Sequence, residues 1–235
     1  MTSRWPKVLP PLEPEQKRIN DDFMRYWHEV FPSRFGIADR WGHRYAVEHA
    51  PVSFRRTLEV GAGIGEHLAF ETLDAEQERA YVALELREGM AERIRVRFPR
   101  VQVRVGDVQQ RLDFPDGHFD RIVAVHVLEH LPDLPAALRE LRRVCAPDGT
   151  LCVVIPCEGS LATACARRIS AQRIYERRYG RPYRLFIERE HLNRPWEVIE
   201  ELAAHFTPVH RGAFPVPLPV QWCNLFLGMT LRPKT

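Results

Sequence analysis

The chain has 235 residues, with 34 Lys and Arg against 31 Asp and Glu, and its formal net charge is +3. This length suits one large α/β domain with appendages, and the charge is too small to indicate nucleic-acid binding by itself. The five cysteines lack paired CxxC spacing, which disfavours a metal site and a disulfide framework. Because no secretory segment opens the chain, a reduced, cytoplasmic setting is expected.

Residues 1–50 are predicted to form an N-terminal helical cap, followed by a main domain over residues 51–235. A helix is expected to begin near Pro14, because apolar residues follow it at spacings of three and four. A second helical piece is expected from Ala38 to His49. The periodicity of apolar residues does not show whether this second helix covers the core or helps to close a ligand pocket.

The stretch Thr57 to His67 is predicted to be a buried strand that runs into a glycine turn and then a helix. Gly61, Gly63 and Gly65 allow close backbone approach and positive φ angles, and the amides that follow would face a ligand. A nicotinamide-binding turn has glycine at its first, third and sixth positions, but the sixth position here is Glu66. A carboxylate at this point disfavours a bound pyrophosphate.

From the glycine turn onward the pattern alternates strand and helix, which is typical of parallel βαβ units. The expected strands are Thr57–Val60, Ala80–Leu86, Val101–Val105, Phe119–Val125 and Thr150–Ile155. The fourth is apolar past Arg121 and should be central. Ligands of such sheets bind beyond the carboxyl ends of the strands, so the chemistry is expected there. The residues at these ends are Gly61, Glu85, Asp107, His126 and Pro156.

Two acidic residues end consecutive strands. Glu85 can accept hydrogen bonds from both ribose hydroxyls of an adenosine, and Asp107 can accept one from an adenine amino group. Either acid alone could equally be a turn or cap residue, but the pair in this order favours a nucleoside site. Glu59 stands inside a strand where an apolar residue is expected. It is either paired at a sheet end or aimed at a cationic ammonium group, and the second interpretation is favoured.

These segments resemble the class I S-adenosylmethionine-dependent methyltransferases. The resemblance covers about Thr57 to Ile155 and rests on five motifs in order, LEVGAGIGE, YVALELREGM, VRVGDV, FDRIVAVHVLEHL and LRRVCAPDGTLCVVIP. It implies an α/β fold with a Rossmann-like, doubly wound, seven-stranded and mostly parallel sheet whose last strand is antiparallel. It also implies S-adenosyl-L-methionine as the cofactor.

The same resemblance implies a set of cofactor contacts. They are Glu59, Gly61, Ala62, Gly63, Gly65, Glu85, Leu86, Met90, Asp107, Val108 and His126. Glu59 lies near the amino-acid end of the cofactor, and the glycines cradle its methionine and ribose portions. Glu85 holds the ribose diol, and Leu86 and Met90 border the adenine. Asp107 and Val108 recognise the adenine edge.

Transfer of a sulfonium-bound methyl group needs an acceptor held in line with the sulfur, and a base if the acceptor carries a proton. His126 is a candidate catalytic base, although a histidine that contacts the cofactor through its backbone alone is the simpler interpretation. His191 is a second candidate base. Glu129 and His130 are interpreted as structural supports.

Residues 156–193 form an insertion too long for an ordinary connection, and a helical lid is predicted there. Its arginines indicate either a solvated helix face or an anionic acceptor, such as a phosphate- or carboxylate-bearing metabolite or a lipid-linked intermediate. Its aromatic residues could bury the lid against the domain or stack on a substrate. The two sets are Arg167, Arg168, Arg173, Arg177, Arg178, Arg181, Arg184 and Arg189, and Tyr175, Tyr179, Tyr183 and Phe186.

The segment from Phe206 should supply the final strand pair, with Asn224–Leu231 as a strand. No residue from Gly212 to Leu231 carries a formal charge, but three prolines exclude a regular membrane-spanning helix there. The proline-rich connection is expected to pack on the lid or on the second copy of a homodimer.

The sequence therefore predicts a methyltransferase that acts on a small molecule, more readily at oxygen than at nitrogen or carbon. Two alternatives are a nicotinamide-dependent oxidoreductase and a non-catalytic protein that retains the fold. A nucleic-acid substrate is disfavoured, because there is no appended RNA-binding module and no asparagine-proline-proline-tyrosine signature after the fourth strand. No metal is expected.

Overall fold

The computed structural model describes residues 4–34 and 36–234, so the outermost residues of the predicted cap and domain lie outside the described residues. Its centre is a seven-stranded sheet in the order β3-β2-β1-β4-β5-β7-β6. The strands are β1 (Thr57–Val60), β2 (Val82–Glu85), β3 (Gln102–Val105), β4 (Phe119–Val125), β5 (Cys145–Pro156), β6 (Phe206–Phe214) and β7 (Phe226–Pro233). Strands β1 to β5 are parallel, and β7 is antiparallel to both of its neighbours. The predicted fold class is confirmed.

The helices are α1 (Pro14–Arg34), α2 (Gly36–Glu48), α3 (Ala75–Ala80), α4 (Glu88–Arg97), α5 (Leu134–Val144), α6 (Leu161–Ile169), α7 (Ala171–Tyr179), α8 (Arg184–Glu190) and α9 (Pro195–His205). Short 3-10 turns are η1 (His67–Phe70), η2 (Leu128–His130) and η3 (Gln221–Cys223). The second strand is shorter than predicted, because α3 takes up Ala80. In the described ranges, no helix has both the length and the apolar composition needed to cross a bilayer.

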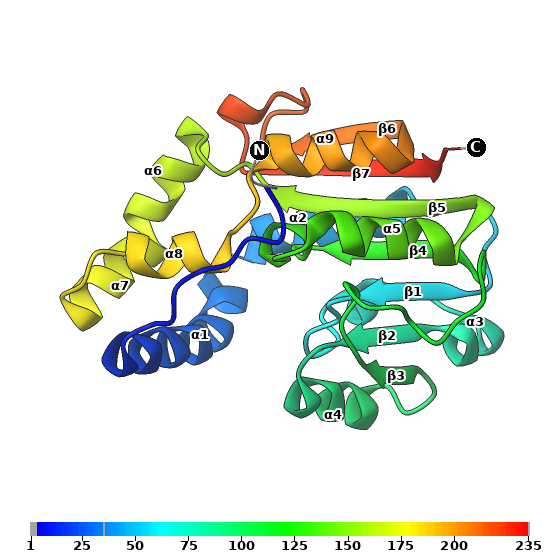
Figure 1. Ribbon diagram of the computed structural model, residues 1–235, viewed down its shortest axis with the longest axis horizontal. Coiled ribbons are helices and arrows are strands. Elements are labelled where there is room, and N and C mark those ends of the chain that lie inside the picture. Colours follow the sequence, from blue (N-terminus) through cyan, green and yellow to red (C-terminus); the bar gives the residue numbers. More distant parts are fainter. Residues whose placement is uncertain (1–3, 35, 235) are drawn as a thin grey trace.

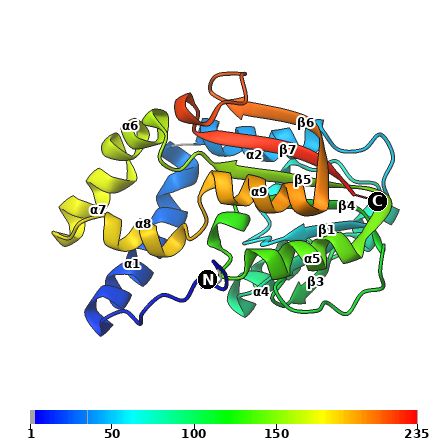
Figure 2. The same ribbon diagram turned by 45° about the horizontal axis from the view of Figure 1, so that its top comes forward.

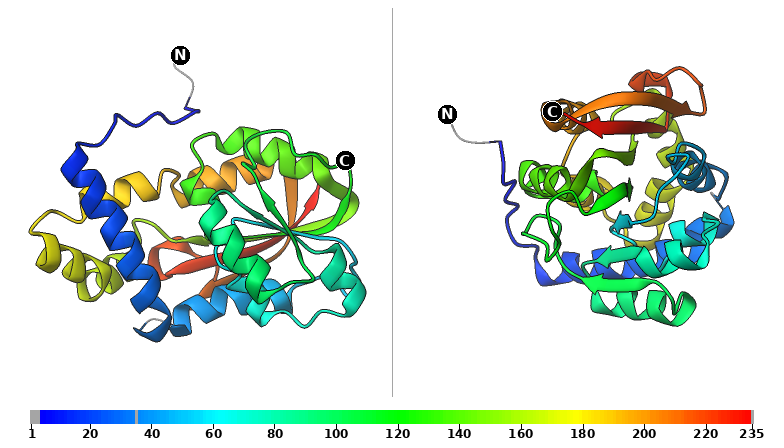
Figure 3. Two further views of the ribbon diagram at one scale, coloured as in Figure 1. Left: turned by 90° about the horizontal axis from the view of Figure 1, so that it is seen from below. Right: turned by 90° about the vertical axis from the view of Figure 1, so that its right-hand side faces the viewer.

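The sheet lies between two layers of helices (Figures 2 and 3). Helices α5 and α9 cover one face, and α2 and α4 cover the other. Strand β4 stands in the middle of the sheet, as its apolar sequence predicts. The fully buried Leu138 and Leu141 of α5 pack on this core, and each such side chain stabilises the fold by about 1.5–3 kcal/mol. The carboxyl ends of the parallel strands are thereby held on a rigid support.

Helices α1, α6, α7 and α8, which we call the cap helices, form a group beyond the carboxyl ends of the parallel strands (Figure 1). The fully buried Phe23 of α1 joins them, because its ring meets those of Tyr175 and Phe186 edge-on at 5.0 and 4.9 Å. Tyr179 and Tyr183 complete the cluster at 6.2 Å. The aromatic residues of the insertion therefore bury it against the N-terminal helix.

Candidate functional site

The glycine turn after β1 has the backbone conformation that its sequence predicts. Gly61, Gly63 and Gly65 have φ angles of +65°, +57° and +82°. A Cβ atom at Gly61 would lie 2.6 Å from the Val127 side chain, and one at Gly65 would lie 2.7 Å from that of Phe98. Glycine is therefore required by both conformation and space, and the turn is packed directly against the segment that follows β4.

Glu66 folds back onto this turn. Its Oε2 atom accepts a hydrogen bond from the amide of Ile64 at 2.8 Å, and it would lie 2.6 Å from a Cβ atom at Gly63. A carboxylate thus occupies the turn where a dinucleotide-binding turn holds a pyrophosphate. The like charges would repel each other, which agrees with the expectation from sequence.

Glu85 connects the tip of β2 to the glycine turn. It is 6% exposed, and its two carboxylate oxygens accept hydrogen bonds from the amides of Gly63 and Arg87, both at 3.0 Å. An ionised carboxylate has about four lone-pair sites, so about two remain for further donors. The predicted contact of this carboxylate with a ribose diol stays a prediction. Leu86 is exposed and Met90 half-buried at the start of the following helix, and their predicted contacts with an adenine stay predictions.

Asp107 lies at the tip of β3, beside β2. Its Oδ1 atom accepts hydrogen bonds from the amide and the side chain of Gln109, both at 2.9 Å, while the adjacent Val108 is buried. The Gln109 amide therefore competes for the acceptor sites that an adenine amino group would use. Sequence reasoning missed Gln109, because a glutamine two residues after a turn carries no distinctive signal. The adenine contact of Asp107 stays a prediction.

Glu59 and Ala62 lie in the core around the turn, where Ala62 is 2% exposed. The Tyr81 hydroxyl donates a hydrogen bond to Glu59 Oε2 at 2.9 Å. Burial is the largest influence on this carboxyl group, and it raises the pKa of Glu59 to about 8. The group is thus mostly protonated at neutral pH, and its predicted contact with a cofactor ammonium stays a prediction.

His126 follows β4 in a strained conformation. Its φ angle of +56° is the only positive value at a non-glycine residue in the described parts of the chain. Its amide donates to the Val154 carbonyl at 2.9 Å, its ring centre lies 4.7 Å from that of Phe226, and its Nδ1 lies 3.6 Å from Glu129 Oε1. The backbone turn thus directs the imidazole to the carboxyl end of the sheet, next to Glu129.

His191 follows α8 and reaches the same end of the sheet. Its Nδ1 lies 2.5 Å from Oε1 of Glu158, which follows β5 and whose side chain is 3% exposed and also pairs with Arg167. Burial opposes ionisation of Glu158, but His191 and Arg167 outweigh it and hold the pKa below its usual range. Glu158 was not singled out from sequence, because its pairing with His191 and with Arg167, one of the arginines predicted to bind an anion, joins separate segments.

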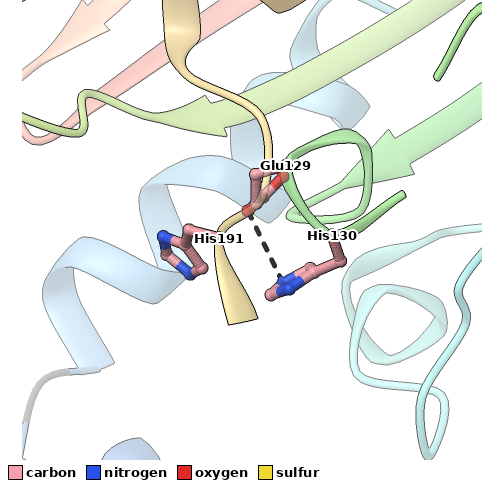
Figure 4. Close-up of side chains that lie close together, drawn as sticks. All are labelled: Glu129, His130 and His191. Atoms are coloured by element: carbon pink, nitrogen blue, oxygen red, sulfur yellow. Dashed lines mark ion pairs between the residues drawn. The ribbon is translucent and has the colours of Figure 1, made fainter. Parts of the chain in front are cut away.

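Glu129 and His130 of η2 lie close to His191 (Figure 4), and Glu129 also lies next to His126. Glu129 is 2% exposed, and its neighbours are His126, His130 and His191. Asn193 holds the segment after α8 in place, because its side-chain amide donates to the carbonyls of Leu128 and Leu131 at 2.8 and 2.7 Å. The site thus contains more ionisable groups than sequence reasoning assigned to it.

Comparison with known proteins agrees with this geometry. Residues 58–153 match the model of a methyltransferase domain family. A malonyl-[acyl-carrier protein] O-methyltransferase of Halorhodospira halophila is 34% identical over 139 residues, which are 57% of this chain and 45% of that protein. The chain thus spans about half the length of the curated relatives it matches.

Solved structures share the fold over most of the chain. A TehB-like methyltransferase from Corynebacterium glutamicum has a TM-score of 0.62 at 16% identity, covering 93% of this chain and 100% of that one. A 1,6-didemethyltoxoflavin-N1-methyltransferase from Burkholderia thailandensis, solved with S-adenosylhomocysteine, has a TM-score of 0.59 at 21% identity, covering 98% and 94%. Residues 58–153 are thus similar to a methyltransferase domain, and the chain shares the fold of solved S-adenosylmethionine-dependent methyltransferases.

Proposed function

We propose that the protein binds S-adenosyl-L-methionine and transfers its methyl group to an oxygen atom of a small, anionic or lipid-linked acceptor. The observation that carries the proposal is the bond between the Glu85 carboxylate and the Gly63 amide. It joins the ribose-binding acid and the glycine turn into one cradle, with Asp107 on the next strand tip. The Glu66 carboxylate supports this cofactor over a nicotinamide dinucleotide.

The acceptor oxygen is supported by the H. halophila relative, which is named an O-methyltransferase of a malonyl group. The charge of the insertion gives weaker support for an anionic acceptor. Three arginines of the insertion already have acidic partners. Arg178 pairs with Asp22 and Arg181 with Glu15, both on α1, and Arg167 pairs with Glu158 at the start of the insertion. The exposed Arg168, Arg173 and Arg177 are the better candidates for an anion.

The bound cofactor would supply a methyl group on a positively charged sulfur. The role of the chain is then to hold the acceptor in line with that group and to receive its proton. His126 stands at the tip of β4, and Glu129 Oε1 lies 3.6 Å from its Nδ1, where it can stabilise the protonated ring. His191, oriented by Glu158, is the second proposed base.

Two measurements test the proposal. The protein should bind S-adenosylhomocysteine but not NAD in a thermal-shift assay, and it should transfer label from methyl-labelled cofactor to a compound in a panel of hydroxyl- and carboxyl-bearing acceptors. Stabilisation by NAD alone would favour an oxidoreductase. Binding of S-adenosylhomocysteine without transfer to any acceptor would favour a non-catalytic protein that retains the fold.

A further inference from the structure

Three side chains with metal-binding atoms converge beside the glycine turn. One donor atom each from Glu129, His130 and His191 lies within 4.8 Å of those of the other two. Glu129 and His130 come from η2, whereas His191 comes from the segment after α8 (Figure 4). The hydrogen bonds of Asn193 fix the segment His191–Asn193 relative to η2. The convergence is therefore built by the fold.

Both imidazoles have their metal-binding nitrogen available. His130 Nδ1 lies 2.5 Å from the carbonyl oxygen of Glu190, and a carbonyl only accepts, so this nitrogen carries the proton. His191 Nδ1 faces the Glu158 carboxylate at 2.5 Å, so it also donates. In a neutral ring the lone pair then lies on Nε2. Metal-binding histidines are oriented in this way by a carbonyl or carboxylate on the other ring nitrogen.

Glu129 is a buried acid with unused bonding capacity. Its Oε2 has no hydrogen-bond partner among the described residues, and its Oε1 lies 3.6 Å from His126 Nδ1 and 3.9 Å from His130 Nε2, too far for strong hydrogen bonds. A buried carboxylate oxygen without a partner is unfavourable, and a cation beside it would relieve the cost.

We infer that Glu129, His130 and His191 bind a divalent first-row transition-metal ion, with the remaining coordination positions open. Two imidazoles and one carboxylate suit ions such as Mn²⁺, Fe²⁺ and Zn²⁺. With metal–ligand bonds of about 2.0–2.2 Å, binding would draw the donor atoms closer together than they are in the unbound site. The expectation of no metal rested on the spacing of the cysteines, none of which belongs to this group.

The position of the ion has a consequence for the reaction. Val127, between His126 and η2, is packed against Gly61 of the cofactor cradle, so an acceptor oxygen bound at an open position would lie next to the cofactor. Coordination would lower the pKa of an acceptor hydroxyl and hold its oxygen in place. With the Nε2 lone pair of His191 on the metal, the proton of the acceptor would pass to His126, the other proposed base. This consequence rests on the proposed function, whereas metal binding itself does not.

A titration of the full chain with Mn²⁺, after removal of metals with a chelator, tests the inference. The electron paramagnetic resonance signal of free Mn²⁺ should show one bound equivalent. Glu129→Gln and His191→Ala should each weaken binding at least tenfold, and Glu158→Gln, which leaves the ligands intact but frees the His191 ring, should weaken it about tenfold. His210→Ala is the matched control, because the exposed His210 stacks on the half-buried His49 at 3.9 Å in a separate pair of histidines.

Circular dichroism shows whether each variant is folded. If a ligand variant does not fold, Mn²⁺ added to the wild-type protein should still selectively broaden the imidazole NMR signals of His130 and His191. The inference would be overturned if the wild-type protein bound neither Mn²⁺ nor Zn²⁺. It would also be overturned if Glu129→Gln and His191→Ala bound Mn²⁺ as tightly as the wild-type protein. S-adenosylhomocysteine binding, measured separately, distinguishes such a failure from a failure of the proposed function.

Discussion

The carboxylate of Glu85 and the amide of Gly63 are 3.0 Å apart and hydrogen-bonded, so the tip of one strand holds the turn that follows its neighbour. If the free lone pairs of this carboxylate bind the cofactor ribose, Glu85→Ala should weaken S-adenosylhomocysteine binding about 10- to 100-fold, the effect of losing about 1.5–3 kcal/mol of charged hydrogen bonding. Isothermal titration calorimetry would measure it. Glu88→Ala, on the exposed surface of α4, should leave the affinity unchanged. Equal affinities of the two variants would contradict the ribose assignment.

At position 126, glycine should give a more stable protein than alanine. At ordinary positions Ala is more stable than Gly, but a φ angle of +56° penalises any Cβ atom. Both substitutions remove the imidazole, so their difference isolates the backbone strain. We expect His126→Gly to be about 1 kcal/mol more stable to urea than His126→Ala. The usual order, with His126→Ala the more stable, would show that the backbone relaxes.

Most of the sheet could be predicted because its strands are short, apolar and separated by clear turn residues. Glu85 and Asp107 were placed correctly at strand tips because the carboxyl ends of parallel strands meet at one edge. What periodicity does not show is the partner of a side chain on a neighbouring strand. The hydrogen bond from Tyr81 to Glu59 is an example, and it explains how β1 accommodates an acid.

The least predictable part of the site depends on contacts between distant segments. His191 lies beside His130 only because Asn193 binds the carbonyls around η2. Likewise, the aromatic residues of the insertion had two possible roles in the sequence, and the position of Phe23 decided between them. Neither contact has a signature in spacing or composition, since each is set by tertiary packing.

The packing of the cap helices against one another should depend on the side chain of Phe23. Phe23 is fully buried among four aromatic rings, and removal of such a ring costs about 3–5 kcal/mol. Phe23→Ala should therefore speed hydrogen exchange in α7 and α8 while the amides of β4 and β5 stay protected. Asp21→Asn is the control, because it removes an exposed ion pair with Lys17 within α1 and should leave exchange nearly unchanged. Equal protection of α7 in both variants would show that other contacts hold the cap.

A buried ion pair between β4 and the residue that follows η1 should make the free energy of unfolding depend on pH in the acidic range. Arg121 of β4 is 1% exposed, and its Nη2 lies 2.7 Å from Glu71 Oε1, which is also 2.7 Å from His67 Nε2. Burial opposes ionisation of Glu71, but His67 and Arg121 outweigh it and lower the pKa from 4.5 to about 2. Because the folded-state pKa is the lower one, this group stabilises the protein fully above about pH 4.5 and loses its contribution as the pH falls towards 2. A shift of this size corresponds to about 3 kcal/mol.

Glu71→Gln should therefore lower the free energy of unfolding by about 3–5 kcal/mol at pH 7, since it leaves the Arg121 guanidinium buried without a counter-charge. It should also flatten the pH profile. Between pH 5 and pH 3 the wild-type protein should lose more stability than the variant, because only the wild-type protein has this carboxylate to protonate. Urea unfolding across that range measures both effects. Glu78→Gln, which disrupts an exposed pair with Arg100, should follow the wild-type curve. Parallel profiles for the wild-type protein and Glu71→Gln would mean that the Glu71 carboxyl group is not preferentially ionised in the folded state.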